Sequence, residues 1–257
     1  MNIAICLTGF IRNLDYINNI KKFYDTVFCS NLVNLNIYYS CPRKLEENDV
    51  NFDESLIIDL FKKQESEKIK INIVFRDYDK MIYVEKARKI NLPYITSNKY
   101  HSHRIISCLN GYSETARLIS NSEINYNFII FSRLDIIKNI ISINKIFDNN
   151  QVLKNSMYIW RTVPYISTGD LSNHVEDRFF ICSSECINLI KEIYNYIDQI
   201  NIEEKNFFTE YVLGDFFNKH SNIQKYHLYN LEVSDDFIIY QTNRINIKYT
   251  DDFLNKM

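Results

Sequence analysis

Short apolar runs and longer amphipathic segments alternate along the chain. The short runs predict buried strands at residues 2–10, 35–40, 68–77, 126–132, 156–160, 177–183 and 236–241. Between them, apolar residues recur at helical spacing, which predicts helices at residues 12–28, 53–63, 81–90, 99–122, 184–197 and 207–220. This alternation is typical of an α/β fold with a Rossmann-like, mixed but mostly parallel sheet flanked by helices. The chain shows no repeat, low-complexity tract or linker, so we expect one domain over residues 1–257.

The segment FIIFSRLDIIKN, residues 128–139, joins a buried strand to a polar end. Arg133 and Asp135 alternate in what reads as extended chain, so they are expected to project to the same side. Ligands of open α/β sheets bind outside the carboxyl ends of the strands. An arginine and a carboxylate at such an end can hold a diphosphate and a divalent metal ion. They can equally form a local ion pair, and the residues alone do not decide between these two interpretations.

A second polar cluster, LTGFIRN, ends the first predicted strand. Thr8 offers a hydroxyl group, and Gly9 lets a ligand approach the backbone. Arg12 lies near the start of a predicted helix, where a phosphate or carboxylate group can bind. The alternative for Arg12 is a solvated position, since it is one of 30 basic residues and most of those face water.

A third cluster, HVEDRFFICSSE, places Glu176 and Asp177 directly before an apolar strand. Either acid can serve as a general base, and either can equally be a turn residue or the partner of Arg178. Trp160 and Tyr165 are candidates for stacking on a sugar or a base, and the alternative for Trp160 is a place that closes the core. The histidines of the chain lack the spacing of metal ligands. His101 and His103 are expected on a solvated helix face together with Arg104.

Composition excludes several classes of protein. The net charge of −2 gives no basic excess for nucleic acid, and no stretch is apolar over the roughly 18 residues of a membrane span. With only 4 glycines, the chain has neither a GxGxxG nor a P-loop motif. The 6 cysteines are scattered without a CxxC pair, which favours reduced thiols. The first residues read as a strand rather than a signal peptide, so we expect a cytoplasmic protein.

Taken in order, five segments resemble a group of GT-A-like glycosyltransferases from capsule and lipopolysaccharide gene clusters and from large DNA viruses. AICLTGFIRN resembles their first strand and turn, and YHSHRIISCLNGYSETARLI resembles their helix before the central strand. YNFIIFSRLDI resembles their stretch ending in Arg-x-Asp. EDRFFICSSECINLI is similar to their phenylalanine-rich strand and the following helix, and FFTEYVLGDFF is similar to a helix near their C-terminal end.

This resemblance implies a GT-A-like fold with a donor half at about residues 1–135 and an acceptor half at about 136–257. Thr8, Gly9 and Arg12 then line the nucleotide pocket, with Arg104 reaching the donor from its helix. Asp135 matches the second acid of the DxD motif, which binds Mn²⁺ or Mg²⁺ on the diphosphate. Arg133 stands where the first acid of that motif belongs. Its positively charged side chain can contact the diphosphate itself, so the resemblance leaves open whether the activity strictly depends on a metal ion.

The resemblance also implies an activity and a catalytic base. Asp177 is in a position similar to the acid that deprotonates the acceptor hydroxyl group, with Glu176 and Asp170 in reserve. The implied reaction moves a sugar from a nucleotide-diphospho-sugar to a glycan acceptor, and a UDP-sugar is the first guess for the donor. If the protein is viral, the expected location is the host cytoplasm. The alternatives are a nucleotidyltransferase or phosphohydrolase, or a non-catalytic glycan-binding module of the same fold. The sugar, the acceptor, the stereochemical outcome and the oligomeric state stay open.

Overall fold

The computed structural model describes ten stretches of the chain. These are residues 1–11, 14–27, 33–43, 53–90, 102–134, 156–162, 179–200, 209–220, 222–230 and 237–241. Among these residues no helix is both long and apolar enough to cross a membrane.

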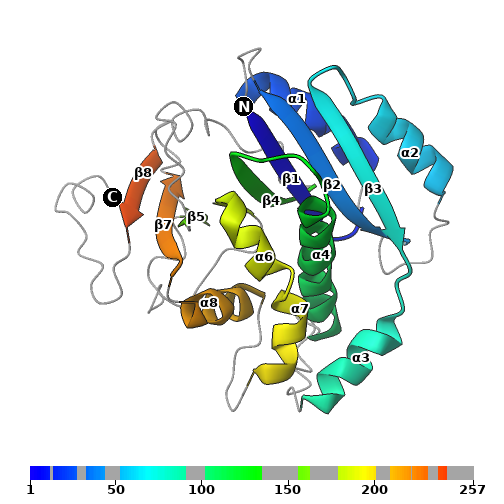
Figure 1. The fold of residues 1–257 in the computed structure, drawn as a ribbon. Coiled ribbons are helices and arrows are strands. Elements are labelled where there is room, and N and C mark those ends of the chain that lie inside the picture. The colour runs from blue at the N-terminus through cyan, green and yellow to red at the C-terminus, as the bar shows by residue number, and fades with distance from the viewer. Residues whose placement is uncertain are drawn as a thin grey trace.

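One mixed sheet organises the described chain (Figure 1). Its eight described strands have the order β3-β2-β1-β4-β6-β5-β7-β8. Their bounds are β1 Asn2–Thr8, β2 Asn34–Pro42, β3 Ile69–Arg76, β4 Phe128–Arg133, β5 Ser156–Thr162, β6 Phe179–Cys182, β7 Gln224–Asn230 and β8 Phe237–Gln241. Strands β1 to β4 are parallel, β6 is antiparallel to both β4 and β5, β7 is parallel to β5, and β8 is antiparallel to β7. The predicted α/β fold with a mixed, mostly parallel sheet is confirmed.

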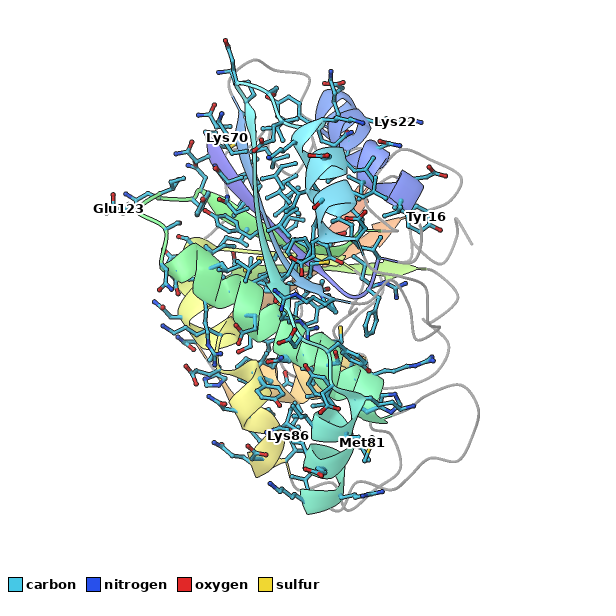
Figure 2. All side chains as sticks on the ribbon, turned by 90° about the vertical axis from the view of Figure 1, so that its right-hand side faces the viewer. Tyr16, Lys22, Lys70, Met81, Lys86 and Glu123 are labelled. Carbon is cyan, nitrogen blue, oxygen red and sulfur yellow. The ribbon has the colours of Figure 1, made fainter. Side chains whose placement is uncertain are left out.

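Helices cover both faces of the sheet (Figure 1). One face packs against η1 (Leu14–Asn18), α1 (Asn19–Val27) and α2 (Glu54–Lys62). The other face packs against α3 (Lys80–Lys89), α4 (Ser102–Ser120), η5 (Ser184–Cys186), α6 (Ile187–Ile190), α7 (Ile193–Tyr196), η6 (Ile197–Gln199) and α8 (Thr209–Lys219). Figure 2 shows the two layers from the side, with Tyr16 and Lys22 on one and Glu123, which follows α4, on the other.

Strand β1 lies at the centre of both cores. Ile3, Ile5 and Leu7 point into the core beneath α1 and α2, whereas Ala4 and Cys6 point into the core beneath α4. All five are 0% exposed, as expected for a parallel strand covered on both faces. The period-2 alternation of strand side chains therefore fixes the face on which each residue lies.

Helix α4 runs antiparallel to β1 and extends past its end. Thr115 hydrogen-bonds the side chain of Cys6 inside the sheet. One turn earlier, Gly111 lies against Thr8, the last residue of β1. The turns of α4 before Gly111 therefore project beyond the carboxyl edge of the sheet. Figure 2 shows α3, which carries Met81 and Lys86, beyond this same edge, at the opposite end of the sheet from Lys70.

Two predictions of secondary structure need correction. The helix expected at residues 184–197 is a series of short α and 3₁₀ segments, because its buried residues recur every third position and three residues per turn is the 3₁₀ repeat. Strand β7 was not predicted, since its sequence QKYHLYN contains few apolar residues. The other described strands agree with prediction, as does α2, where Asp53 accepts a hydrogen bond from the Leu56 N–H at 3.1 Å as an N-cap.

Candidate functional site

The strand order reverses beside β1. Strands β2 and β3 are added on one side of β1, and β4 is added on the other. The helix that follows β1 covers one face of the sheet, and the helix that precedes β4 covers the opposite face. Ligands of open α/β sheets bind at the carboxyl edge where such a reversal occurs. The ends of β1 and β4 therefore mark the candidate site.

Thr8 and Arg133 are direct partners at this point. They form the last pair of the parallel register between β1 and β4. Both side chains lie on the α4 face of the sheet, because Thr8 continues the alternation of Cys6 and Arg133 continues that of Phe131. Two of the clusters singled out in the sequence thus meet at one position of the fold.

Gly9 makes the turn after β1 in a backbone conformation that favours glycine. Its φ is +88°, in the left-handed region, and no atom of the other described residues lies within 4 Å of the place where a Cβ would stand. Backbone conformation rather than lack of space therefore requires glycine here. The Tyr39 hydroxyl group donates a hydrogen bond of 2.8 Å to the Gly9 carbonyl and fixes the turn.

The Thr8 side chain is almost fully buried, with 1% of its surface exposed. Within the described part of the chain, its Oγ1 atom has no hydrogen-bond partner. Buried hydroxyl groups are normally hydrogen-bonded, so an orphaned one calls for a reason such as a water molecule or a ligand group. Its place beside Gly9 and Arg133 makes a ligand group the relevant candidate.

Arg76, the last residue of β3, is a site residue that the sequence patterns did not reveal. Its Nη1 atom donates to the Tyr83 hydroxyl group at 2.7 Å, and its Nη2 atom lies 3.4 Å from both the carbonyl oxygen and the Oγ of Ser107. Among described residues, its buried Nε atom has no partner. The feature of the sequence that could have revealed Arg76 is its position at the end of a strand, because Arg76 ends β3 just as Arg133 ends β4.

The guanidinium group of Arg76 reaches from β3 toward β1. A Cβ on Gly111 would lie 3.8 Å from Arg76 Nη2 and 3.8 Å from Thr8 Cβ, so both side chains border the same position of α4. The positive charge also acts on Cys41 at the end of β2. Burial raises the pKa of the Cys41 thiol to about 12, and the Arg76 charge opposes that rise.

The two helices beyond the edge hold Arg76 in place. The Tyr83 hydroxyl group of α3 accepts from Arg76 and also from Asn110 Nδ2 of α4, at 3.2 Å. The Tyr83 ring stacks on Tyr78, with ring centroids 5.5 Å apart, and the rings of Tyr78 and Phe10 form a T-shaped pair with centroids 4.8 Å apart. The turn after β1, the end of β3 and both helices therefore form one packed unit.

Strand β6 enters the sheet at the same edge. It is antiparallel to β4, and its first residue, Phe179, pairs with Ser132 next to Arg133. The chain that follows the acids Glu176 and Asp177 thus joins the sheet where β4 ends. These two acids themselves lie outside the described residues.

Other predicted residues are not brought together by the described structure. Arg104 is exposed in the first turn of α4, about two helical turns before Gly111, and its contact with the donor stays a prediction. The expected solvated face is wrong for His103, which is buried at 5% exposure. The predictions for Arg12, Asp135, Tyr165 and Asp170 lie outside the described residues, as does that for His101, and the side chain of Trp160 is likewise not described.

The described donors at the carboxyl edge suit an anion. Among the described residues, no group of three or more His, Cys, Asp or Glu side chains could hold a metal ion. The Thr8 hydroxyl and the two guanidinium groups donate hydrogen bonds, which fits phosphate or carboxylate oxygens rather than a cation. Asp135, the predicted ligand for Mn²⁺ or Mg²⁺, follows Arg133 closely in the sequence but is outside the described part.

Comparison with known protein families finds no match for this sequence, and comparison with curated proteins finds none either. Among solved structures, the chain is similar to mouse xyloside xylosyltransferase 1 in its apo form. The two share 13% sequence identity, and the match covers 89% of this chain and 83% of that chain, with a TM-score of 0.39. The chain thus has a distant structural similarity, one of fold only, to a glycosyltransferase.

Proposed function

We propose that the protein is a glycosyltransferase that moves a sugar from a nucleotide-diphospho-sugar to a glycan acceptor. The observation that carries the proposal is the pairing of Thr8 with Arg133 at the reversal of strand order. A diphosphate leaving group gains negative charge as the sugar departs, and hydrogen-bond donors placed there stabilise that charge. The sequence resemblance, with its segments in the same order along the chain, supports the same activity.

In this proposal each half of the chain has its own task. About residues 1–135 bind the donor, with Thr8, Gly9, Arg12 and Arg133 around its diphosphate and UDP as the first nucleotide to test. About residues 136–257 bind the acceptor. Asp177 removes the proton from the attacking hydroxyl group, and entry of β6 at the carboxyl edge supports that role. Mn²⁺ or Mg²⁺ binding through Asp135, and a cytoplasmic location, belong to the same proposal.

The first test is ligand-dependent thermal stability. Purified protein is heated with UDP-, GDP- and TDP-sugars, each with and without Mn²⁺. A ligand at 100 times its Kd stabilises the folded state by about 2.7 kcal/mol, which is a clear rise in Tm. We expect one nucleotide class to produce that rise, Arg133→Gln to reduce it, and Asp135→Ala to remove the part that depends on Mn²⁺.

A matched control separates binding from general damage. Arg117 lies in the last turn of α4, toward the amino edge of the sheet, and pairs with Glu114, so Arg117→Gln removes the same charge away from the site. It should leave the ligand-induced shift intact. If no nucleotide sugar raises the Tm or is slowly hydrolysed, the proposal is wrong. Transfer of a whole nucleotidyl group, or release of phosphate without sugar transfer, would indicate the alternative nucleotide enzymes.

A further inference from the structure

Arg76 differs from another arginine at the same edge of the sheet. Arg43, which follows β2, is exposed and pairs with the carboxylates of Glu54 and Asp77. Arg76 is partly buried, and in the described chain its hydrogen-bond partners are the neutral groups of Tyr83 and Ser107. A charge withdrawn from water is normally paired with an opposite charge. Within the described residues, the less solvated of these two arginines is therefore the one that lacks a counter-charge.

Two side chains that each carry an orphaned atom border the same position of α4. Arg76 Nε and Thr8 Oγ1 are both buried and both lack a hydrogen-bond partner among described residues. Their side chains approach Gly111 from two sides, each 3.8 Å from the place of a Cβ. An N–H group and an O–H group that both need an acceptor are best satisfied by an anionic oxygen.

The sheet sets this pair beside the candidate donor site. In the order β3-β2-β1-β4, Thr8 lies between Arg76 and Arg133, and all three side chains are on the α4 face. Two arginines on either side of a hydroxyl group provide separate positive charges at one edge. A single phosphate needs only one of them, whereas a diphosphate has two charged groups.

We propose that Arg76 is a second diphosphate-binding arginine, which acts with Thr8 on the side of the site away from Arg133. The guanidinium group and the Thr8 hydroxyl group donate to oxygens of one phosphoryl group, while Arg133 serves the other. Tyr83, Ser107 and Asn110 hold the guanidinium group in position without neutralising it. This inference rests on the proposed function and deepens it, because it makes the diphosphate, rather than a monophosphate, the group that the site recognises.

The test compares ligands that differ by one phosphate. Calorimetric titration of the full chain measures Kd for UDP and UMP, and for GDP and GMP, in wild type and in Arg76→Gln. Charge-assisted hydrogen bonds predict that Arg76→Gln weakens diphosphate binding by about 10- to 100-fold and monophosphate binding by less than about twofold. Arg76→Lys keeps the charge but not the fork of donors, so it should give an intermediate loss. Arg43→Gln should change neither affinity.

A second variant leaves Arg76 unchanged. Thr8→Val removes the hydroxyl group that lacks a partner among the described residues and keeps the branched shape of the side chain. We expect a Tm that is unchanged or higher, because an unsatisfied buried polar group is removed, together with weaker diphosphate binding, a combination that general damage does not produce. This variant also provides the test if Arg76→Gln does not fold.

The outcomes separate this inference from the proposed function. If wild type binds a nucleotide diphosphate but Arg76→Gln weakens diphosphate and monophosphate binding equally, Arg76 is structural and the inference is wrong, while the proposed function stands. The inference is also wrong if Thr8→Val leaves diphosphate affinity unchanged. If wild type binds none of the nucleotides, both fail.

Discussion

The two ends of the parallel strands differ in how their polar groups are satisfied. At the amino end, the backbone N–H of Asn2 donates to Asn127 Oδ1 at 2.9 Å, and the Asn127 N–H donates back to the Asn2 carbonyl at 2.9 Å. Asn34 donates to the Met1 carbonyl at 2.8 Å and, through Nδ2, to Asn2 Oδ1 at 3.1 Å. This end is closed by neutral amides that bind one another.

The carboxyl end is not closed in this way. Thr8 Oγ1 and Arg76 Nε are buried there without a partner in the described chain, and Gly9 holds a conformation that few other residues adopt. Unsatisfied donors and a constrained turn cost stability. Under the proposed function, the amino end of the sheet serves folding and the carboxyl end serves a ligand, at some expense of stability.

The largest expected effect is on catalysis at the carboxyl end. Asp177→Asn keeps the size of the side chain but removes the proposed base, so kcat for release of UDP from a UDP-sugar should fall by about 100-fold or more. The Tm should change little. Asp77→Asn is the matched control, since Asp77 is an exposed acid near the same edge that pairs with Arg43. An unchanged kcat in Asp177→Asn would remove this residue from the mechanism.

For the candidate site, the sequence predicts where strands end but not which strands are neighbours in the sheet. The strand ends at Thr8 and Arg133 were predictable, because each closes a run of apolar residues that only a buried strand explains. Their pairing was not, since the choice of neighbouring strands is a long-range property of the sheet. Sequence patterns could place both residues at carboxyl ends, and the structure shows that the two ends are adjacent.

Arg76 shows why other site residues escape sequence analysis. In the sequence it is one of 30 basic residues and ends an alternating segment without any motif. Its distinguishing feature is a set of neutral partners, Tyr83 from α3 and Ser107 from α4, which only the packing of these helices brings together. Strand β7 was missed for a related reason, because Tyr226 and Leu228 are too few apolar residues to set a clear period.

The next effect concerns the turn at Gly9. The methyl group of Gly9→Ala meets no atom of the described chain within 4 Å, so its cost comes from backbone conformation, about 1–2 kcal/mol of the free energy of unfolding. Gly111→Ala is the matched comparison, because Gly111 is helical and alanine there should raise that free energy by about 0.5–1 kcal/mol. Urea unfolding measures both. A Gly9→Ala variant as stable as wild type would show that the turn is not constrained.

Alkaline pH should weaken the sheet through buried thiols, whereas the amides of the amino end do not titrate. Burial raises the pKa of the Cys41 thiol from an ordinary value of 9.0 to about 12. Because the folded pKa is the higher one, the stability is fully present below pH 9 and is lost as pH rises toward 12. This one group predicts a loss on the order of 1 kcal/mol by pH 10.

Cys41→Ala isolates this contribution. The pKa values of Cys6 and Cys182 are also raised by burial, so wild type should lose stability beyond the share of Cys41. Urea unfolding at pH 8, 9 and 10 should give a shallower decline for Cys41→Ala than for wild type. Parallel curves for Cys41→Ala and wild type would contradict the assignment.

The smallest effect is expected at the amino end. Asn127→Ala removes the acceptor of the Asn2 N–H, and this bond is exposed, so the free energy of unfolding should fall by only about 0.5 kcal/mol. Asn125→Ala is the control, because Asn125 accepts from Asn2 through its backbone carbonyl and keeps that bond. Neither variant should change the Kd for UDP, since both lie at the end of the sheet opposite to Thr8. A weaker Kd in Asn127→Ala would mean that the two ends are coupled, and the division between a folding end and a ligand end would fail.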